Sequence, residues 1–439
     1  MKKSAYLNVI RGRSEYLLHN TLNGTIAKAK CIRTRSIIDN LDKEVSFKYD
    51  ESNAFHKFLY DLGMIVRDGV DERNLLNYRF HEANRDELEI ILFVTRQCNF
   101  RCVYCYEKHE NKCMRPELYV NLAKAIKKEV DTKRYKSVLL SFFGGEPMLE
   151  YDTICAFMEN MRKFASEANI TVSGGMTTNA HLLTYEKLKR LVELNVLSFQ
   201  ITLDGLKETH DSNRLLVGGG ATWERIIQNL KDAKNSDLGF EITLRTNISA
   251  NSADMIENYL RYISSNFAND NRFKYHFEAI KDLGGDIDPR LYDNNNDRKV
   301  VEEIISTAKE VGLQASLFSY GFMPFGYMCY ASKNNNLAVD TDGTLRKCTV
   351  DIYSEENAVG ILSDKGFEIE DIKICDWTSY DLPEECYDCK ILPLCFGRKC
   401  PLSIKTLGDC DKSYCSTILA YYESSLLYYY KLDGFPNKV

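Results

Sequence analysis

Residues 88–106 read LEIILFVTRQCNFRCVYCY and join an apolar run to three closely spaced cysteines. The run over 88–94 has the composition of a β-strand. Cys98, Cys102 and Cys105 follow it directly, separated by three and then two residues. In β/α barrels, reactive groups lie on the loops after the carboxyl ends of the strands. The stretch therefore predicts an α/β protein with its chemistry on the loop after the first sheet strand.

Further strand-like runs alternate with helical stretches along the chain. The strand-like runs lie at 137–143, 170–173, 197–203, 240–246 and 273–277. The helical stretches lie at 117–130, 154–168, 185–194, 223–234 and 253–264. Repeated strand-then-helix units predict a parallel sheet with right-handed crossovers, closed or partly closed into a barrel. We therefore expect a partial (β/α)6 TIM-like barrel over residues 85–312.

The segments on either side of this barrel have different patterns. Residues 1–84 hold short apolar stretches and a periodic run that ends at Gly63, which predicts a winged-helix-like α+β domain. Within the join to the barrel, residues 72–88 are polar and predict a linker. Residues 313–439 are rich in cysteine, a composition that needs metal to fold. A polar loop, a helix and a tyrosine-rich terminal helix are expected at 281–299, 299–311 and 414–432.

Composition restricts the function class. The 439 residues are 44% hydrophobic and 27% charged, which suits a soluble protein of two or three domains. No apolar run approaches the roughly 20 residues of a membrane span, and no signal peptide is recognised, so we expect a cytoplasmic protein. The net charge of -6 argues against a general nucleic-acid binder. Residues 1–36 are strongly basic and are either a site for an acidic partner or a solvated face.

The chain holds 15 cysteines. Cytosolic thiols stay reduced, so metal or cofactor ligation explains this number better than disulfides do. Besides the first three, eight lie in the C-terminal quarter: Cys329, Cys348, Cys386, Cys389, Cys395, Cys400, Cys410 and Cys415. The other four, Cys31, Cys113, Cys155 and Cys375, follow no recognisable spacing, and for most of them we expect a buried apolar role.

The three-cysteine loop favours one kind of metal centre. Structural zinc needs four ligands, and His109 is a weak candidate for the fourth. A [4Fe-4S] cluster on three thiolates leaves one iron for an amino-carboxylate ligand. Backbone amides of a tight loop also stabilise the negative charge of a cluster. An iron-sulfur cluster is therefore the better fit, with Tyr106 as a candidate to pack beside a nucleobase.

The loop resembles the C-x3-C-x2-C signature of radical S-adenosylmethionine (SAM) enzymes. Further motifs of that superfamily occur in order at the predicted strand ends: Gly144-Gly145-Glu146-Pro147, Thr177-Thr178-Asn179, Leu203-Asp204-Gly205, His210-Asp-Ser-Asn-Arg214 and Arg245-Thr246-Asn247. The resemblance implies a [4Fe-4S] cluster on Cys98, Cys102 and Cys105. It also implies a 5'-deoxyadenosyl radical, made from SAM, that removes a hydrogen atom from a substrate carbon.

The same resemblance implies a SAM pocket. Gly144 and Gly145 would let the SAM amino group approach the backbone, and Glu146 would accept its charge. Asp204 would lie near the ribose, while the guanidinium fork of Arg214 would pair with the SAM carboxylate. The remaining candidate contacts are Tyr104, Asn179 and Arg245.

The C-terminal cysteines resemble the SPASM extension, whose pattern is C-x(9-15)-G-x4-C, then C-x2-C-x5-C-x3-C, then a final C. Cys329, Gly343 and Cys348 match the first part. The second part is matched by Cys386, Cys389, Cys395 and Cys400, with four residues instead of three before Cys400. The final ligand is Cys415 or, as an alternative, Cys410.

This resemblance implies two auxiliary clusters and three [4Fe-4S] clusters in all. Auxiliary cluster I would be held by Cys329, Cys348 and Cys400, and auxiliary cluster II by Cys386, Cys389, Cys395 and Cys415. The fourth ligand of auxiliary cluster I stays open among Cys375, Cys410, another protein group and a substrate thiolate. The auxiliary clusters would stabilise a small domain, accept the electron left by product formation, or do both.

Residues 1–84 resemble the precursor-recognition element of SPASM peptide maturases through residues 16–24 (YLLHNTLNG) and 62–66 (LGMIV). The resemblance implies that a precursor peptide binds through its leader segment at a strand edge, where basic residues suit an acidic leader. It also implies an electron donor of flavodoxin or ferredoxin type. We therefore expect a peptide maturase that makes an intramolecular carbon-carbon cross-link, such as the Lys-Trp link of streptide-type peptides.

Three alternatives stay open. The first is a cysteine thioether, as in sactipeptides, for which an open auxiliary iron would hold the substrate thiolate. The second is formylglycine formation in a sulfatase, although the related enzymes have Asp directly after the cysteine that matches Cys348, whereas this chain has Thr349 and then Asp351. The third is a non-enzymatic protein, an iron-sulfur electron carrier or a zinc-finger binding module, which explains the C-terminal cysteines but not Gly144 to Pro147, Asp204 or Arg214.

Overall fold

The computed structural model describes residues 1–41, 43, 47–83, 85–249, 256–280, 304, 306–308, 310–313, 322–379, 382, 384–397, 400–402, 419, 422 and 426. The chain divides into two compact units. Unit 1 contains Met1–Asn84, Leu317–Ser332 and Ser379–Val439, and unit 2 contains Arg85–Ser316 and Lys333–Thr378. The loop expected over 281–299 lies outside the described residues, as do Cys410, Cys415 and most of the helices expected near 299–311 and over 414–432.

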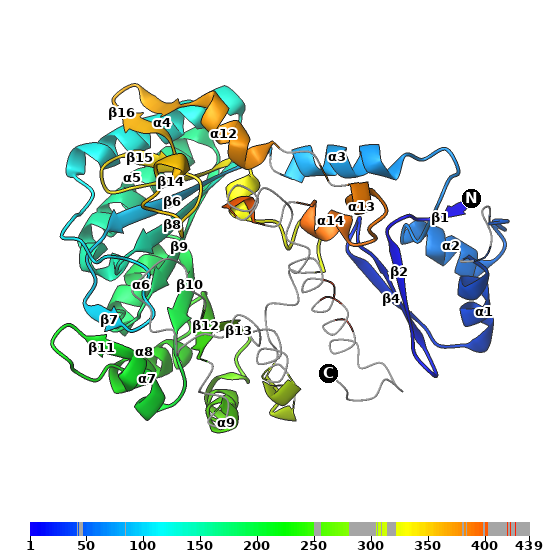
Figure 1. Cartoon of the computed structure of the whole chain (residues 1–439), viewed down its shortest axis with the longest axis horizontal. Coiled ribbons are helices and arrows are strands. Elements are labelled where there is room, and N and C mark those ends of the chain that lie inside the picture. Colours follow the sequence, from blue (N-terminus) through cyan, green and yellow to red (C-terminus); the bar gives the residue numbers. More distant parts are fainter. Residues whose placement is uncertain are drawn as a thin grey trace. The chain divides into compact units, whose positions relative to one another are not determined.

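Unit 2 is built on a parallel sheet whose strands follow one another in chain order (Figure 1). Its parallel strands are β6 (Glu87–Thr95), β8 (Ser137–Gly144), β9 (Thr171–Thr178), β10 (Val196–Thr202), β12 (Glu241–Ile248) and β13 (Phe273–Ala279). The order is open, as in a partial barrel. This arrangement confirms the α/β fold and the parallel sheet predicted from the strand-like runs.

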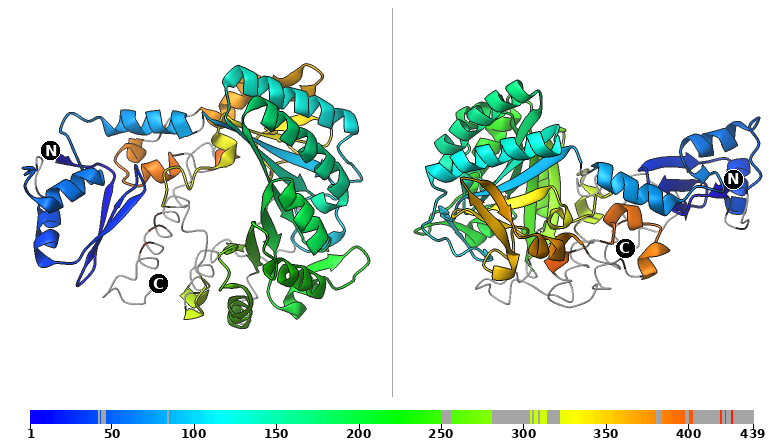
Figure 2. Two further views of the ribbon diagram at one scale, coloured as in Figure 1. Left: turned by 180° about the vertical axis from the view of Figure 1, so that it is seen from behind. Right: turned by 90° about the horizontal axis from the view of Figure 1, so that it is seen from above.

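Helices connect the parallel strands and lie over the outer face of the sheet (Figure 2, left). They are α4 (Pro116–Lys133), α5 (Tyr151–Ala168), α6 (Tyr185–Glu193), α7 (Lys207–Asn213), α8 (Trp223–Lys234) and α9 (Ile256–Phe267). Strand β6 is buried continuously from Ile90 to Thr95, whereas β12 and β13 alternate between buried and half-buried residues. The apolar run that precedes the first cysteines is therefore the strand covered on both faces.

The C-terminal part of the chain extends this sheet beyond β6. Strand β14 (Asn336–Val339) runs parallel to β6, with Asn336 opposite Glu89. Antiparallel strands β15 (Thr344–Arg346), β16 (Ala358–Ser363) and β17 (Gly366–Ile369) follow, and helix α12 (Asp371–Thr378) ends the segment. Gly343 provides the left-handed conformation, φ +91°, of the turn between β14 and β15. Residues of the domain predicted over 313–439 thus belong to both units.

Unit 1 contains a three-stranded antiparallel sheet and short helices. Its elements are β1 (Lys2–Lys3), β2 (Leu7–Arg11), β3 (Tyr16–Asn20), β4 (Thr25–Ala29), α1 (Ile32–Leu41), α2 (Ala54–Asp61), β5 (Ile65–Val66), α3 (Glu72–Ala83), α13 (Glu384–Tyr387) and α14 (Leu392–Cys395). Strand β3 lies between β2 and β4, while β1 pairs with β5. Leu7, Leu18, Ile38 and Leu59 form the centre of one apolar core. Unit 1 therefore combines antiparallel strands with short helices.

The prediction of a polar linker over 72–88 is wrong for its first part, because Glu72–Ala83 form helix α3. The Asp71 carboxylate caps this helix by accepting hydrogen bonds from the backbone N–H groups of Arg73 and Asn74 at 3.0 and 3.1 Å. Leu76 and Phe80 are one helical turn apart and are buried in a second apolar cluster of unit 1. Two apolar anchors are enough to place a helix whose other residues are mostly polar.

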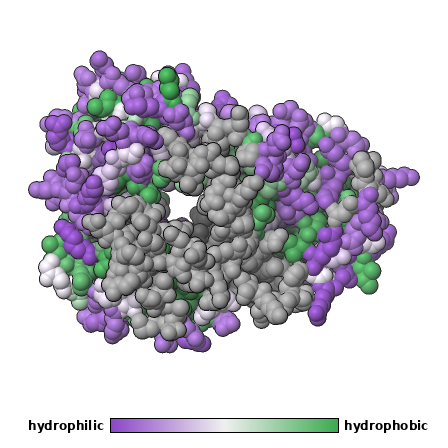
Figure 3. All heavy atoms as spheres, in the orientation of Figure 1, coloured by the Kyte–Doolittle hydropathy of each residue, from purple (hydrophilic) through white to green (hydrophobic). Residues whose placement is uncertain are grey.

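Among the residues coloured in Figure 3, hydrophobic ones are scattered among hydrophilic ones. Isolated exposed residues such as Ile32 and Ile372 are ordinary for a protein surface. Within the described residues, every helix is too short or too polar to cross a bilayer.

Buried His19 gives unit 1 a specific pH dependence. Its Nδ1 accepts from the Tyr422 hydroxyl at 2.8 Å, and its Nε2–H donates to the carbonyl of Phe322 at 3.0 Å. Burial lowers the pKa of His19 to about 4. Because the unfolded chain binds a proton at this histidine near pH 6.5, the stability from neutral His19 is complete above that pH and is lost as the pH falls toward 4.

Between pH 7 and pH 4, the free energy of unfolding should therefore fall by roughly 3 kcal/mol less in His19→Gln than in the wild type. Urea titrations of both proteins across this range measure the effect. The glutamine amide retains one donor and one acceptor. The two proteins should therefore differ mainly in how steeply the free energy of unfolding falls with decreasing pH. Parallel stability curves would contradict the assignment.

Candidate active site

The first three cysteines lie on the loop after β6 and within a two-stranded ribbon. Strand β7 (Phe100–Cys102) pairs antiparallel with β11 (Arg214–Leu216), which sets Cys102 opposite Arg214. The Phe100 N–H donates to the Cys98 Sγ at 3.3 Å, and all three cysteines are half-buried. The pairing brings Arg214 opposite Cys102, which lies more than a hundred residues earlier in the chain.

These thiols suit a metal cluster. Burial raises the pKa of Cys98 and Cys105 to about 12, and it also raises the pKa of Cys102, where the Arg214 cation opposes the effect. Such thiols lose their protons when metal binds. In the part of the chain that the structure describes, no three Cys, His, Asp or Glu side chains converge on the position of a single ion. Cys98, Cys102 and Cys105 on one short loop provide three thiols, the ligand set of a [4Fe-4S] cluster that keeps one iron open.

The glycine pair at the end of β8 packs directly against the start of the cysteine loop. Gly145 N–H donates to the Thr95 carbonyl at 3.0 Å, and Glu146 N–H donates to the Gln97 carbonyl at 2.8 Å. A β-carbon on Gly144 would collide with the Thr95 carbonyl, and one on Gly145 would collide with the Gln97 carbonyl. The glycines therefore allow two backbone segments to approach each other next to Cys98.

The Glu146 carboxylate joins the carboxyl ends of two neighbouring strands. It is buried and accepts hydrogen bonds from the Met148 N–H at 2.9 Å, the Thr178 hydroxyl at 2.6 Å and the Asn179 N–H at 2.7 Å. Burial raises the pKa of Glu146, although these three donors oppose the shift. Two carboxylate oxygens have about four acceptor positions, so one position is left for a further donor.

Tyr104, Asp204, Arg214 and Asn247 form a single polar network. The Tyr104 hydroxyl donates to the Asp204 Oδ2 and accepts from the Arg214 Nη1 at 2.7 Å and the Asn247 Nδ2 at 3.2 Å. The Asn247 N–H donates to the Asp204 Oδ1 at 2.8 Å. Burial raises the pKa of Tyr104 well above its ordinary value, so its hydroxyl keeps its proton.

Arg214 has the capacity to bind an anion. Its side chain is only 8% exposed, and its Nη1 lies 3.9 Å from the Asp204 Oδ2. Its Nε–H is buried and has no hydrogen-bond partner among the described residues. A buried, unsatisfied guanidinium donor is costly unless a ligand fills it. The carboxylate of SAM is an acceptor of the right chemistry for this fork.

The other two SAM candidates occupy supporting positions. Asn179 donates through Nδ2 to the Asn99 Oδ1 at 2.8 Å, and its own Oδ1 accepts from the His181 N–H at 3.0 Å. Arg245 donates through Nε to the Asn247 Oδ1 at 2.9 Å. Of the predicted motif Arg245-Thr246-Asn247, Asn247 is the residue that bonds directly to Tyr104 and Asp204.

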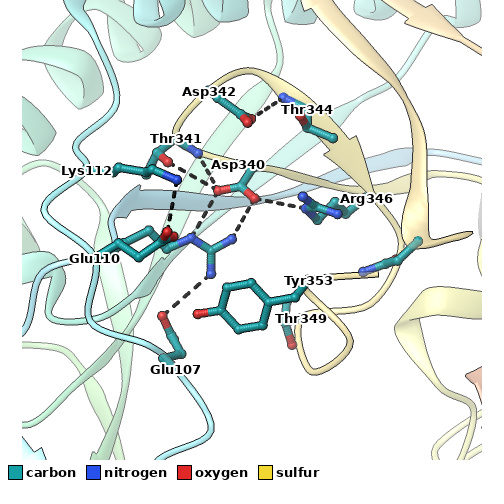
Figure 4. Close-up of polar contacts among 12 residues, drawn as sticks. Glu107, Glu110, Lys112, Asp340, Thr341, Asp342, Thr344, Arg346, Thr349 and Tyr353 are labelled. Atoms are coloured by element: carbon teal, nitrogen blue, oxygen red, sulfur yellow. Dashed lines mark hydrogen bonds and ion pairs between the residues drawn. The ribbon is translucent and has the colours of Figure 1, made fainter. Parts of the chain in front are cut away.

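A buried ion network lies beside the same loop (Figure 4). Arg96 donates through Nε and Nη2 to the two carboxylate oxygens of Asp340, at 3.1 and 2.6 Å, and its Nη1 lies 3.6 Å from the Glu107 Oε2. Arg346 donates to Asp340 at 2.9 Å. Hydrogen bonds and charge from the arginines outweigh burial and hold the pKa of Asp340 below its usual range, whereas burial raises the pKa of Glu107 to about 7. The network joins the ends of β6 and β14.

The C-terminal cysteines belong to different units. Cys348 is buried in unit 2, in the turn after β15. Among the described residues, the C-terminal cysteines of unit 1 are Cys329, Cys386, Cys389, Cys395 and Cys400. Cys386 lies on α13 and Cys395 on α14, while Cys389 lies between these helices and its N–H donates to the Cys386 carbonyl at 3.1 Å. Cys375 is exposed on α12.

Comparison with known proteins identifies the sheet and its cysteine loop. Residues 92–245 match the Radical SAM superfamily. The chain contains a radical SAM domain. Enzymes of this superfamily bind SAM and a [4Fe-4S] cluster, and the match includes every site residue described above for β6 to β12 up to Arg245.

Relatives and solved structures agree with this assignment. The chain is 21% identical to the radical SAM cyclopropyl synthase TigE of Paramaledivibacter caminithermalis, over 94% of this chain and 90% of the relative. It is 30% identical to a cysteine-type anaerobic sulfatase-maturating enzyme of Clostridium novyi, over 30% of this chain and 37% of the relative. The fold is similar to that of anSMEcpe with bound AdoMet, with a TM-score of 0.61, 18% identity and coverage of 78% of this chain and 93% of that chain. It is also similar to that of Streptococcus suis SuiB bound to S-adenosylmethionine, with a TM-score of 0.51, 15% identity and coverage of 92% and 97%.

Arg214→Lys should weaken SAM binding by about 10- to 100-fold, because a lysine cannot replace the planar fork and one charged hydrogen bond contributes roughly 1.5–3 kcal/mol. Anaerobic equilibrium dialysis with SAM measures the affinity. Arg190→Lys on the exposed face of α6 is the matched control and should bind SAM like the wild type. Equal affinity in all three proteins would exclude Arg214 from the SAM site.

Gly145→Ala should disrupt the cysteine loop, because the added methyl group collides with the Gln97 carbonyl. We expect a loss of about 1–3 kcal/mol in unfolding free energy and reduced iron binding. Gly239→Ala is the control, since no atom lies within 4 Å of the position its β-carbon would take. Chemical denaturation and iron analysis check both variants, and wild-type values for Gly145→Ala would refute the close-packing argument.

Proposed function

We propose that this protein is a radical SAM peptide maturase that installs an intramolecular carbon-carbon cross-link in a ribosomally made precursor peptide. The observation that carries the proposal is the similarity to a radical SAM cyclopropyl synthase over 94% of this chain and 90% of the relative. A cyclopropyl ring is closed by a carbon-carbon bond. The similarity therefore favours this bond type, of which a Lys-Trp link is one example, over a thioether.

The site residues would each hold one part of SAM. When a [4Fe-4S] cluster and SAM are bound at Cys98, Cys102 and Cys105, they supply a 5'-deoxyadenosyl radical that removes a hydrogen atom from a substrate carbon. Arg214, through its unpaired Nε–H, would fix the SAM carboxylate. The remaining acceptor position of Glu146 suits the SAM amino group. Asp204, held by Tyr104 and Asn247, would orient the ribose.

Unit 1 would bind the leader segment of the peptide. In the described part of the chain, β4 is an edge strand of the sheet β2-β3-β4 and pairs with β3 on one side only. An edge strand offers backbone donors and acceptors for an added strand. Lys28 lies on β4 and pairs with Glu15 at 2.8 Å, whereas Lys30 directly after β4 lies 4.0 Å from Glu15 and is 75% exposed. The exposed charge of Lys30 suits an acidic leader.

The C-terminal cysteines would hold two auxiliary clusters. Cys386 and Cys395 lie on two short consecutive helices of unit 1 and Cys389 lies in the turn between them, which supports a shared centre. Cys348, Cys329 and Cys400 would hold the other cluster. When the cross-link forms, the substrate radical loses one electron and one proton, and an auxiliary cluster would take up that electron. A flavodoxin or ferredoxin would supply the electron that starts each cycle.

Formylglycine formation is the second candidate, favoured by the 30% identity to a cysteine-type sulfatase-maturating enzyme. That similarity covers 30% of this chain, and Thr349 occupies the position where the related enzymes have Asp. The anSMEcpe fold has also been solved with AdoMet and a Cp18Cys peptide, which supports a peptide substrate for either candidate.

The test begins with a search of the neighbouring reading frames for a short peptide with an acidic leader, followed by anaerobic reaction of the reconstituted protein with SAM, a reductant and that peptide. We expect loss of two hydrogens from the peptide, formation of 5'-deoxyadenosine and no change in the number of alkylatable thiols. Tandem mass spectrometry locates the link between two side-chain carbons. The Cys98→Ala, Cys102→Ala, Cys105→Ala triple variant is the control and should be inactive.

Other products identify the other candidates. Loss of two hydrogens together with one alkylatable thiol would indicate a thioether. A hydrazide-reactive aldehyde on a sulfatase peptide would indicate formylglycine. An unmodified peptide in every reaction, despite production of 5'-deoxyadenosine from SAM, would reject the maturase proposal.

A further inference from the structure

A tyrosine hydroxyl joins the cysteine loop to the segment that carries Cys348. Tyr106 follows Cys105 directly in the chain, and its hydroxyl donates to the Thr349 carbonyl at 3.1 Å. Thr349 in turn follows Cys348 and is 8% exposed. A single hydrogen bond therefore connects the neighbours of two predicted cluster ligands, within one compact unit.

The peptide group that receives this hydrogen bond also contacts the Cys348 sulfur. Its carbonyl belongs to Thr349, and its N–H belongs to Val350, which donates to the Cys348 Sγ at 3.4 Å. A peptide group is planar, so a bond that orients the carbonyl also orients the N–H. A donor on the carbonyl further polarises the amide and strengthens the bond that the N–H makes.

The rest of the Cys348 segment is held independently of Tyr106. The side chain of Asn357 is fully buried, accepts from the Cys348 N–H at 2.8 Å and donates to the Cys348 carbonyl at 2.7 Å. It also donates to the Asp351 carbonyl at 2.8 Å. These contacts fix both ends of the turn, so removal of the Tyr106 hydroxyl should alter the intervening peptide without unfolding the segment.

The cysteine loop that carries Tyr106 is held at both of its ends by contacts with the segment that follows β14. Arg96 precedes the loop and forms a bidentate ion pair with Asp340. Lys108 follows Tyr106, and its backbone N–H donates to the Tyr353 hydroxyl at 2.8 Å. The Tyr106 hydroxyl thus spans two segments whose separation is set by contacts on either side of it.

We propose that Tyr106 is a positioning residue that tunes the Cys348 thiolate and, through it, the reduction potential of the cluster that Cys348 helps to hold. The proposal rests on the auxiliary cluster of the proposed function. An N–H···S bond stabilises the additional negative charge of a cluster that has taken up one electron, so hydrogen bonds to the sulfurs raise its potential. The residue beside the SAM-binding cysteines would in this way set how readily the second centre accepts an electron.

The direct test is Tyr106→Phe, which keeps the ring and removes the hydroxyl. In anaerobic redox titrations followed by electron paramagnetic resonance, we expect the ratio of reduced to oxidised Cys348-dependent cluster to fall about threefold at a fixed potential, equivalent to ~30 mV for a one-electron couple. Tyr185→Phe is the matched control, because it removes a tyrosine hydroxyl at the exposed start of α6, outside the cysteine loop and the Cys348 segment. Its titration should match that of the wild type.

Two further variants keep the outcome decisive. Val350→Pro removes the N–H donor itself and should lower the potential in the same direction, and Tyr106→Phe added to it should have no further effect. Additive shifts, or a wild-type potential in Tyr106→Phe, would overturn the tuning role. If Tyr106→Phe loses iron, Val350→Pro alone decides the direction of the shift.

Iron analysis of Cys348→Ala separates this inference from the proposed function. Loss of one cluster in that variant supports the auxiliary centre, and an unchanged potential in Tyr106→Phe would then reject the tuning role alone. Iron content equal to that of the wild type would reject the auxiliary cluster at Cys348 and the tuning role together.

Discussion

The buried charge of Arg96 is the constraint on which the arrangement of unit 2 depends. Its side chain is 3% exposed, and the bidentate ion pair with Asp340 neutralises it at the point where β6 ends and the cysteine loop begins. Breaking one partner of such a pair costs roughly 3–5 kcal/mol, because the other charge stays buried and unpaired. Asp340 directly follows β14, so the pair holds together the ends of two neighbouring parallel strands. The cysteine loop and the Cys348 segment both start from this fixed point.

From that point the site extends along the carboxyl edge of the sheet. The glycine pair after β8 touches the backbone of the cysteine loop, and Glu146 connects β8 to β9. The Tyr104 hydroxyl reaches Asp204 after β10 and Asn247 on β12. Each strand end is therefore tied to its neighbour or to the loop by hydrogen bonds. Such a site can hold a reactive ligand in one orientation because few of its polar groups are free to move.

The sequence was sufficient to predict elements with a strong local pattern. The six parallel strands and most of their helices have apolar periodicity within a single segment. Their approximate bounds can therefore be predicted without knowing which strand or helix each one packs against. The cysteine spacing and the strand-end motifs likewise predict which loop carries chemistry. Tyr104, Asp204 and Arg214 were all selected from the sequence, and the structure brings them into one network. Their mutual contacts, in contrast, depend on the pairing of β7 with β11.

Long-range pairing is what the sequence did not reveal. Strand β14 has only four residues, and its partner β6 is separated from it by residues 96–335. A four-residue strand with three apolar residues carries no signal that identifies a partner strand at that distance. The partnership of Arg96 with Asp340 was hidden for the same reason. Helix α3 was missed because it has only two buried apolar positions, Leu76 and Phe80, in a polar sequence.

The late position of β14 in the chain has a consequence during synthesis. Strand β6 emerges from the ribosome early, but the strand that covers its outer edge is made only after residues 96–335. At 5–20 residues per second this interval lasts roughly 12 to 48 s. An uncovered edge next to an apolar strand is a template for pairing with other chains. Nascent molecules of this protein are therefore most exposed to aggregation and most dependent on chaperones during this interval. Truncated translation products that lack β14 should keep this edge of β6 uncovered permanently.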